Sequence, residues 1–379
     1  MENFEIYNPV KAYFGRNVID KLSKEILEHG SRILLVYGKG SIKENGIYDA
    51  VMRQISKAGA EVYEYSGIKP NPVIGDVRAA VSFGKDKGVD LIIAVGGGSV
   101  IDSAKVMAVG IAGDADPWDY VKGRRTPDSG IPLIAVLTLA ATGTEMNRFA
   151  VVQDNESREK VGFGYPPMYP AVSFLDPAYT MSVSAEYTAF GITDLVAHAL
   201  EAYFGKGDAS LSDRFVFSII KEAIKYGPPL MNDLHNYDLR ARIMYAATMA
   251  LNNLTMYGRV SGDWGVHSIG HVLSVLYDVP HGASLSIAYP AWMKLHKDNA
   301  GDRILQLGQE LFGSSSADES IQAFEEYFTL IKSPVRLSQT SYGSYDQEEI
   351  VATLTSNRVS GAHHKMSAKD YQELISLMW

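Results

Sequence analysis

The chain has 379 residues, of which 46% are hydrophobic and 21% are charged. This composition excludes a disordered or fibrous protein, and the length predicts two domains, since single domains usually run to about 100–200 residues. The formal net charge of −9, from 44 acidic and 35 basic residues, argues against a nucleic-acid partner. Because there is no cysteine, a metal would be held by imidazole and carboxylate groups.

The N-terminal residues Met1-Glu2-Asn3-Phe4-Glu5 carry acid where a signal peptide carries base. No apolar run reaches the length of about 18 residues that a membrane span needs. We therefore expect a cytoplasmic protein that binds no membrane.

Short apolar runs alternate with amphipathic stretches in the first half of the chain. Strands are predicted at Arg32–Tyr37, Glu61–Tyr65, Leu91–Val95 and Leu133–Leu137, with helices that begin near Ser41, Ile74 and Ser99 after the first three. This βαβ rhythm predicts a parallel sheet. Alternating segments near Ala150–Gln153 and Val172–Leu175 are predicted to be strands that lie over the sheet, and the sheet region ends near Asp176-Pro177.

In the second half, apolar residues recur at helical spacing. Helices are predicted at Ala185–Phe204, Leu211–Tyr226, Leu239–Leu254 and Trp264–Leu276. We therefore expect a Rossmann-like α/β domain over 1–180 and an all-α domain over 181–379.

The predicted strand Leu91–Val95 is followed at once by Gly96-Gly97-Gly98-Ser99, which opens a helix. Residues without Cβ let backbone N–H groups approach a pyrophosphate, and the helix N-terminus adds unpaired donors and favourable partial charge. An anion is expected there. The alternative is a tight turn of purely structural purpose with Ser99 as the helix N-cap.

A second loop, Gly38-Lys39-Gly40-Ser41, follows the first predicted strand of the βαβ series, where doubly wound folds contact the adenosine ribose. An acidic residue there would bind the ribose 2′-hydroxyl and repel a 2′-phosphate, but this chain has Lys39. The loop therefore favours NADP(H) over NAD(H), although NAD(H) stays open and Lys39 could also be a solvated loop lysine.

Nine histidines include one set at helical spacing. Asp194 and His198 are four residues apart on one predicted helix, His267 and His271 are four apart on another, and His281 lies in the following turn. Each pair shares one helical face, and a carboxylate with several imidazoles suits a first-row divalent cation. A lone histidine is more often structural, and the remaining histidines lack such spacing. These are His29, His235, His296, His363 and His364.

Together these motifs resemble the iron-containing (group III) alcohol dehydrogenases over nearly the whole chain, and within that family the butanol dehydrogenase and NADP-dependent aldehyde reductase branch. The matching segments are Tyr37–Lys43, Lys69-Pro70-Asn71-Pro72, Gly96–Ser99 with Asp102 and Lys105, Thr138–Glu145, Leu175-Asp176-Pro177, Asp194, His198, Asp263-Trp264, His267, His271 and His281-Gly282. Thr144 replaces a serine that is common in the family, and Lys39 replaces a common glycine.

The resemblance implies a dehydroquinate synthase-like fold with a dinucleotide-binding domain and a helical metal-binding domain, usually paired as a homodimer. It implies that one divalent metal, Fe(II) or Zn, is held by Asp194, His198, His267 and His281, and that His271 acts in proton transfer. Together with the loop described above, it implies contacts with NADP(H) from Gly38, Lys39, Ser41, Asn71, Gly97, Gly98, Ser99, Asp102, Thr138, Thr142, Asn147 and Lys160.

The expected function is thus hydride transfer between NADP(H) and a short-chain alcohol or aldehyde, in a cleft between the two domains, with the metal as Lewis acid. Polyol dehydrogenation of the glycerol type is the nearest alternative. A dehydroquinate-synthase-like lyase would be expected to have a site with one glutamate, two histidines and a basic cluster, which is not the pattern here. A non-enzymatic sensor would not need His271.

Overall fold

A computed structural model describes residues 1–379, which divide into two compact units. One unit comprises residues 7–183 and 235–244 and contains the sheet; the other comprises 1–6, 184–234 and 245–379 and is helical. Each unit thus contains more than one stretch of chain, whereas the domain assignment made from the sequence has a single boundary at 180 and stays a prediction. No helix is both long enough and apolar enough to cross a membrane.

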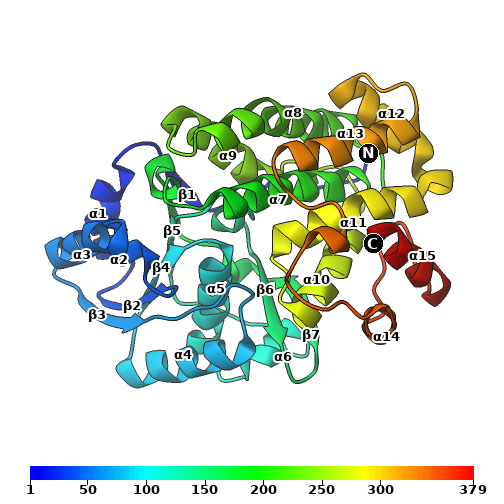
Figure 1. Cartoon of the computed structure of the whole chain (residues 1–379). Coiled ribbons are helices and arrows are strands. Elements are labelled where there is room, and N and C mark those ends of the chain that lie inside the picture. Colours follow the sequence, from blue (N-terminus) through cyan, green and yellow to red (C-terminus); the bar gives the residue numbers. More distant parts are fainter. The chain divides into compact units, whose positions relative to one another are not determined.

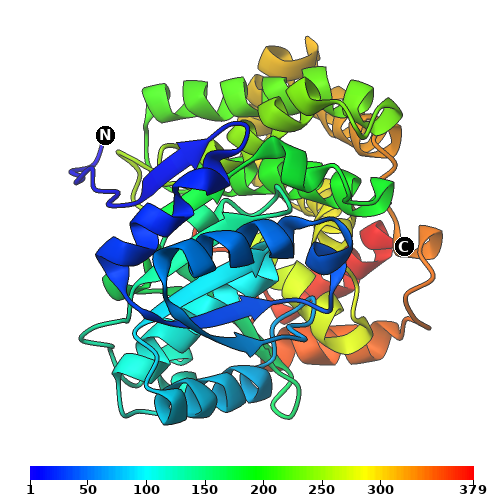
Figure 2. The same ribbon diagram turned by 90° about the vertical axis from the view of Figure 1, so that its left-hand side faces the viewer.

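The sheet unit has six parallel strands in the order β1-β8-β5-β4-β2-β3 (Figures 1 and 2). Its strands are β1 (Lys11–Phe14), β2 (Arg32–Tyr37), β3 (Glu61–Tyr65), β4 (Leu91–Gly96), β5 (Leu133–Leu137) and β8 (Val172–Leu175). A separate antiparallel pair consists of β6 (Phe149–Asp154) and β7 (Glu159–Gly164). The helices of the sheet unit are α1 (Leu22–His29), α2 (Ser41–Glu44), α3 (Ile47–Ala58), α4 (Ile74–Lys87), α5 (Gly98–Ala112) and α6 (Pro117–Val121).

Both faces of this sheet are buried, as expected for parallel strands joined by helices. On one face, Leu34 and Ile92 pack against α4 and α5; on the other, Ile33 and Ile93 pack against α1 and α3. Figure 1 shows α4 and α5 on one side of the strands and α1 to α3 on the other. The predicted βαβ arrangement is confirmed.

One strand prediction is wrong. β8 does not lie over the sheet but within it, since Val172 pairs with Ile134 of β5 and with Lys11 of β1. All four residues of β8 are buried. The polar Ser173 makes the segment look alternating, as a strand with one exposed face would, but its hydroxyl is buried and donates to the Glu145 backbone carbonyl at 2.6 Å.

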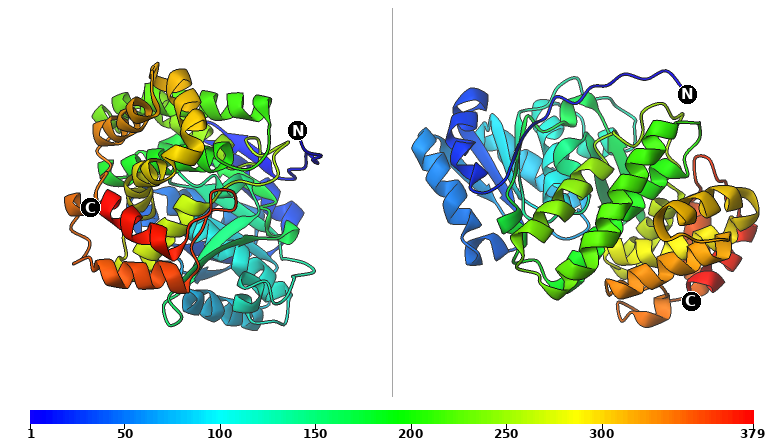
Figure 3. Two further views of the ribbon diagram at one scale, coloured as in Figure 1. Left: turned by 90° about the vertical axis from the view of Figure 1, so that its right-hand side faces the viewer. Right: turned by 90° about the horizontal axis from the view of Figure 1, so that it is seen from above.

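The second half of the chain is helical, as predicted. Its helices are α7 (Ala185–Tyr203), α8 (Ser210–Asn232), α9 (Tyr237–Ala250), α10 (Gly265–Tyr277), α11 (His281–Leu295), α12 (Lys297–Phe312), α13 (Ala317–Leu330), α14 (Gln347–Ser356) and α15 (Ala368–Met378). Helix α11 packs against α7, α10, α13 and α15, so it lies at the centre of the helical unit (Figures 1 and 3). The helices α7, α10 and α11 carry the predicted metal-binding residues.

Candidate functional site

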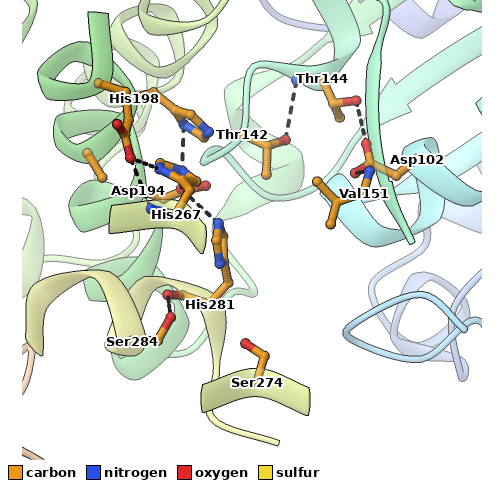
Figure 4. Close-up of polar contacts among 12 residues, drawn as sticks. Asp102, Thr142, Thr144, Val151, Asp194, His198, His267, Ser274, His281 and Ser284 are labelled. Atoms are coloured by element: carbon orange, nitrogen blue, oxygen red, sulfur yellow. Dashed lines mark hydrogen bonds and ion pairs between the residues drawn. The ribbon is translucent and has the colours of Figure 1, made fainter. Parts of the chain in front are cut away.

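The four predicted metal-binding side chains come together inside the helical unit. Helix α7 is buried along nearly its whole length and carries Asp194 and His198 on one face, with 2% and 5% of their surfaces exposed. His267 lies in the first turn of α10, and His281 is the first residue of α11. Figure 4 shows these side chains pointing toward one another.

The distances fit shared ligation better than hydrogen bonding. Asp194 Oδ1 lies 3.5 Å from His198 Nδ1, 3.7 Å from His267 Nε2 and 3.6 Å from His281 Nε2. These separations are too long for good hydrogen bonds. Two ligands of one tetrahedral ion at about 2.1 Å would be about 3.4 Å apart, so the spacing suits donors that face one cation.

Not all four donors are equivalent. The ligand atoms of Asp194, His267 and His281 all lie within 4.8 Å of one another, and His198 lies beside this group, with its ring centroid 4.6 Å from that of His267. Asp194 Oδ1, His198 Nδ1 and His267 Nε2 are buried and have no hydrogen-bond partner. Since buried polar atoms are nearly always satisfied, this donor set fits a divalent ion.

The two neighbouring imidazoles have opposite electrostatic environments. Burial lowers the pKa of His198 to about 4, although the charge of Asp194 opposes the shift. Burial also disfavours a charge on His267, but the negative charges of Asp194 and of its hydrogen-bond partner Glu201 outweigh burial and raise its pKa to about 9. The buried carboxylates therefore create a region that favours positive charge.

Close approach of the helices depends on Gly282. A Cβ atom at this position would lie 2.3 Å from the backbone oxygen of Phe190 on α7, which no side chain could tolerate. The glycine therefore lets the first turn of α11, with His281, come against α7. His271, on α10, is partly exposed, and its ring centroid lies 5.7 Å from that of His281.

A second group of possible ligands, Glu25, Glu28 and His29, lies within the same distance limit on α1. Here the Lys11 ammonium already contacts Glu25 at 2.6 Å. This cation makes the group a poor site for a metal, since it neutralises the buried carboxylate.

In the sheet unit, the predicted phosphate-binding turn joins β4 to α5. Gly97 is the N-cap residue of α5, and no side chain caps the helix, so the alternative with Ser99 as the N-cap is not what the structure has. A Cβ on Gly98 would lie 2.7 Å from Thr142 Cγ2, and one on Gly97 would lie 3.1 Å from Leu139 Cβ. The glycines thus bring the turn against the loop after β5.

The other predicted cofactor residues follow neighbouring strands at the same edge of the sheet. Thr138 follows β5 and donates its N–H to the Gly96 carbonyl at 3.0 Å, while Gly38 follows β2. Lys39 and Ser41 are exposed. Strand order reverses between β2 and β4, which is where doubly wound sheets bind nucleotides.

Asn71 and Lys160 form a pair of their own. The Lys160 ammonium donates to Asn71 Oδ1 at 2.7 Å, and Asn71 has a left-handed backbone with φ 58°. The structure thus joins the loop after β3 to the β6–β7 hairpin, although the two residues are far apart in sequence.

Asp102 and Asn147 are held in a buried network. Asp102 accepts from the Thr144 hydroxyl at 2.6 Å, and Asn147 accepts from the Lys105 ammonium at 3.0 Å. Lys105 also donates to the Thr144 hydroxyl at 2.6 Å and to the Phe149 carbonyl at 2.7 Å, so three acceptors match its three N–H groups. Burial lowers its pKa to about 7. The network shapes the loop that carries Thr138 and Thr142.

Sequence reasoning missed Glu201, which is 1% exposed and hydrogen-bonds to His267. The available signal was its spacing, since it lies seven residues after Asp194 and three after His198 on the same helix. Such spacing places all three on one helical face.

Comparison with known proteins agrees with this geometry. The chain matches the model of the family described as iron-containing alcohol dehydrogenase over residues 9–177, and that of the C-terminal region of the Fe-containing alcohol dehydrogenase family over residues 188–378. The chain therefore belongs to the iron-containing alcohol dehydrogenase family. It is an oxidoreductase with the α/β and helical fold expected from the sequence.

Individual relatives cover almost the whole chain. It is 37% identical to the probable NADH-dependent butanol dehydrogenase 1 of Bacillus subtilis, over 99% of both chains, and 34% identical to the NADPH-dependent aldehyde reductase YqhD of Escherichia coli, over 89% of both. The crystal structure of NADH-dependent butanol dehydrogenase A from Thermotoga maritima is similar, with a TM-score of 0.95, 36% identity and coverage of 100% of this chain and 99% of that one.

Proposed function

We propose that this chain is a metal-dependent alcohol dehydrogenase and aldehyde reductase that transfers hydride between NADP(H) and a short-chain alcohol or aldehyde. Family membership supports a nicotinamide cofactor and a metal. The observation that carries the proposal is the convergence of one carboxylate and three imidazoles in the helical unit, with three donor atoms that lack hydrogen bonds.

We assign Asp194, His198, His267 and His281 as ligands of one divalent ion, Fe(II) or Zn. When bound, the metal supplies a Lewis acid toward the substrate oxygen, and the dinucleotide supplies or accepts the hydride. The carboxylate offsets part of the metal charge. His271 holds or moves the proton that the substrate oxygen gains on reduction, since its imidazole lies next to that of His281.

The sheet unit binds the cofactor through backbone as well as side chains. Gly97, Gly98 and Ser99 present N–H groups at the start of α5 to the pyrophosphate. The remaining contacts are assigned to Gly38, Lys39, Ser41, Asn71, Asp102, Thr138, Thr142, Asn147 and Lys160. Asp102 and Asn147 contribute at least in part through the buried network that positions the loop after β5.

NADP(H) is preferred over NAD(H) because the loop after β2 has a cation and no acid. Lys39 is exposed and can approach a 2′-phosphate, and the Ser41 hydroxyl lies two residues on. The relatives carry both names, NADH-dependent in Bacillus subtilis and NADPH-dependent in Escherichia coli, so the cofactor must be measured on this chain.

The test is an assay of the purified protein with butanal and other short aldehydes, with NADPH and NADH side by side. Metal-stripped protein should be inactive, and activity should return with Fe(II) or Zn(II). Equal turnover before and after metal removal would contradict the proposal, as would turnover of glycerol-type polyols in preference to simple alcohols. The homodimer and the cytoplasmic location stay predictions. Light scattering of the purified protein would measure its mass in solution and so test the homodimer.

A further inference from the structure

A single buried carboxylate connects two of the helices that carry the proposed metal ligands. Glu201 lies near the end of α7, and its side chain contacts the beginning of α10. Its Oε1 accepts from the backbone N–H of His267 at 3.0 Å and lies 2.8 Å from His267 Nδ1, while its Oε2 accepts from the backbone N–H of Trp264. Both oxygens of this carboxylate thus contact the short segment from Trp264 to His267.

These contacts orient the His267 ring. An ionised carboxylate only accepts hydrogen bonds, so Nδ1 of His267 must be the donor toward Glu201. Nε2 is then the ring nitrogen directed toward Asp194 Oδ1, 3.7 Å away. An imidazole needs a lone pair on the atom that meets a metal, and the partner of its other nitrogen decides which atom that is.

The same carboxylate also fixes the start of α10. Trp264 is the N-cap residue, has a left-handed backbone with φ 63° and receives no cap from its own side chain. Glu201 instead accepts from the N–H of the N-cap residue and from that of His267, three residues on. When a side chain of one helix caps a neighbouring helix, it fixes where the capped helix begins relative to the first helix. This sets His267 opposite Asp194, which lies two turns before Glu201 on α7.

We propose that Glu201 is a positioning residue that preorganises the metal site by fixing both the start of α10 and the tautomer of His267. The inference rests on the proposed function, because it needs the helical unit to bind a metal. It goes further in assigning a role to a residue that touches no proposed substrate or cofactor.

The test is metal affinity of the stripped full-length chain, measured with Zn(II) alone in competition with a chelating dye. Glu201→Gln keeps the shape of the side chain but replaces one acceptor oxygen with an NH2 group, which only donates. The two oxygens that accept from His267 and from Trp264 are therefore reduced to one. We expect the dissociation constant to rise about 10–100-fold. A value within about threefold of wild type would overturn the proposal.

The matched control is Asp263→Asn. Asp263 is also 1% exposed and accepts backbone N–H groups near the start of α10, from Gly265, His363 and His364, but it contacts no ring of a proposed ligand. This variant should lower the melting temperature yet change Zn(II) affinity less than threefold. A control that loses affinity as much as Glu201→Gln would mean that any disturbance of α10 has this effect, and would overturn the specific role.

A second measurement does not require the variant to fold. In wild-type protein loaded with Zn(II) and labelled with nitrogen-15 in histidine, the nitrogen shifts of His267 should report Nδ1–H with Nε2 bound to metal. Coordination through Nδ1 would overturn the proposal. Wild type that binds no Zn(II) at all would instead contradict the proposed function, so the two failures are distinguishable.

Discussion

The two units build their candidate sites from different chemical groups, backbone in the sheet unit and side chains in the helical unit. In the sheet unit, the candidate phosphate site consists largely of backbone at Gly97–Ser99 and the uncapped start of α5. In the helical unit, the candidate metal site consists of buried side chains, three of whose atoms lack hydrogen bonds. A backbone site depends on close approach and tolerates graded change, whereas a side-chain ligand site is lost when one donor is removed. The predictions below test this contrast.

The largest effect is expected at the shared carboxylate. Asp194→Asn removes the charge that faces three imidazoles, so the buried ligands lose their anionic partner. We expect bound metal to fall from about one ion per chain to near zero and kcat/KM for butanal reduction to fall at least about 1000-fold. Elemental analysis and steady-state kinetics check this. His235→Ala, in the sheet unit, is the control, and retention of metal and rate by Asp194→Asn would refute the assignment.

The next largest effect separates proton transfer from metal binding. His271→Ala removes an imidazole next to His281 that we do not assign as a ligand. We expect full metal content and a kcat that is about 100-fold lower, at the lower end of the range of about 100–10,000-fold that general acid–base groups typically contribute. Loss of metal together with activity would instead make His271 a ligand.

A smaller effect is expected in the backbone site. Gly98→Ala places a methyl group 2.7 Å from Thr142 Cγ2, so the turn and the loop after β5 must separate. The expected result is a KM for NADPH about tenfold higher with unchanged metal content, about 1.4 kcal/mol of cofactor binding. Gly75→Ala in α4 is the control, because a Cβ there meets no atom within 4 Å. Equal effects of both variants would argue against a pyrophosphate at this turn.

The smallest effect concerns cofactor choice. Lys39→Ala removes one exposed cation, and exposed ion pairs contribute about 0.2–1 kcal/mol. The KM for NADPH should rise about two- to fivefold while that for NADH is unchanged. If both rise together, Lys39 contacts the shared part of the cofactor, and if neither changes, it is a solvated loop residue.

Much of this contrast could be predicted from the sequence, because its signals are local. Apolar runs and glycines marked β2, β4, β5 and the turn after β4, and four-residue spacing marked the ligand pairs. The resemblance to the family then supplied the assignment of roles, and the family itself is confirmed.

What escaped prediction depends on tertiary contacts. β1 was missed because its four residues are mostly exposed at the sheet edge, without an apolar signal. Helix α8 continues to Asn232 through Pro228 and Pro229, where a helix end was predicted at Tyr226. Glu201 and Lys105 look like surface residues in a sequence, since only the fold shows that each is buried with its hydrogen-bond partners.

The central claim is that one cation is bound by α7, α10 and α11 together. The most direct measurement is anomalous X-ray scattering from crystals of the reconstituted protein, recorded on both sides of the absorption edge of the added metal. We predict a single peak about 2.0–2.2 Å from ligand atoms of Asp194, His198, His267 and His281. A peak at other residues, or none near Asp194 in protein that binds metal and turns over aldehyde, would contradict the account.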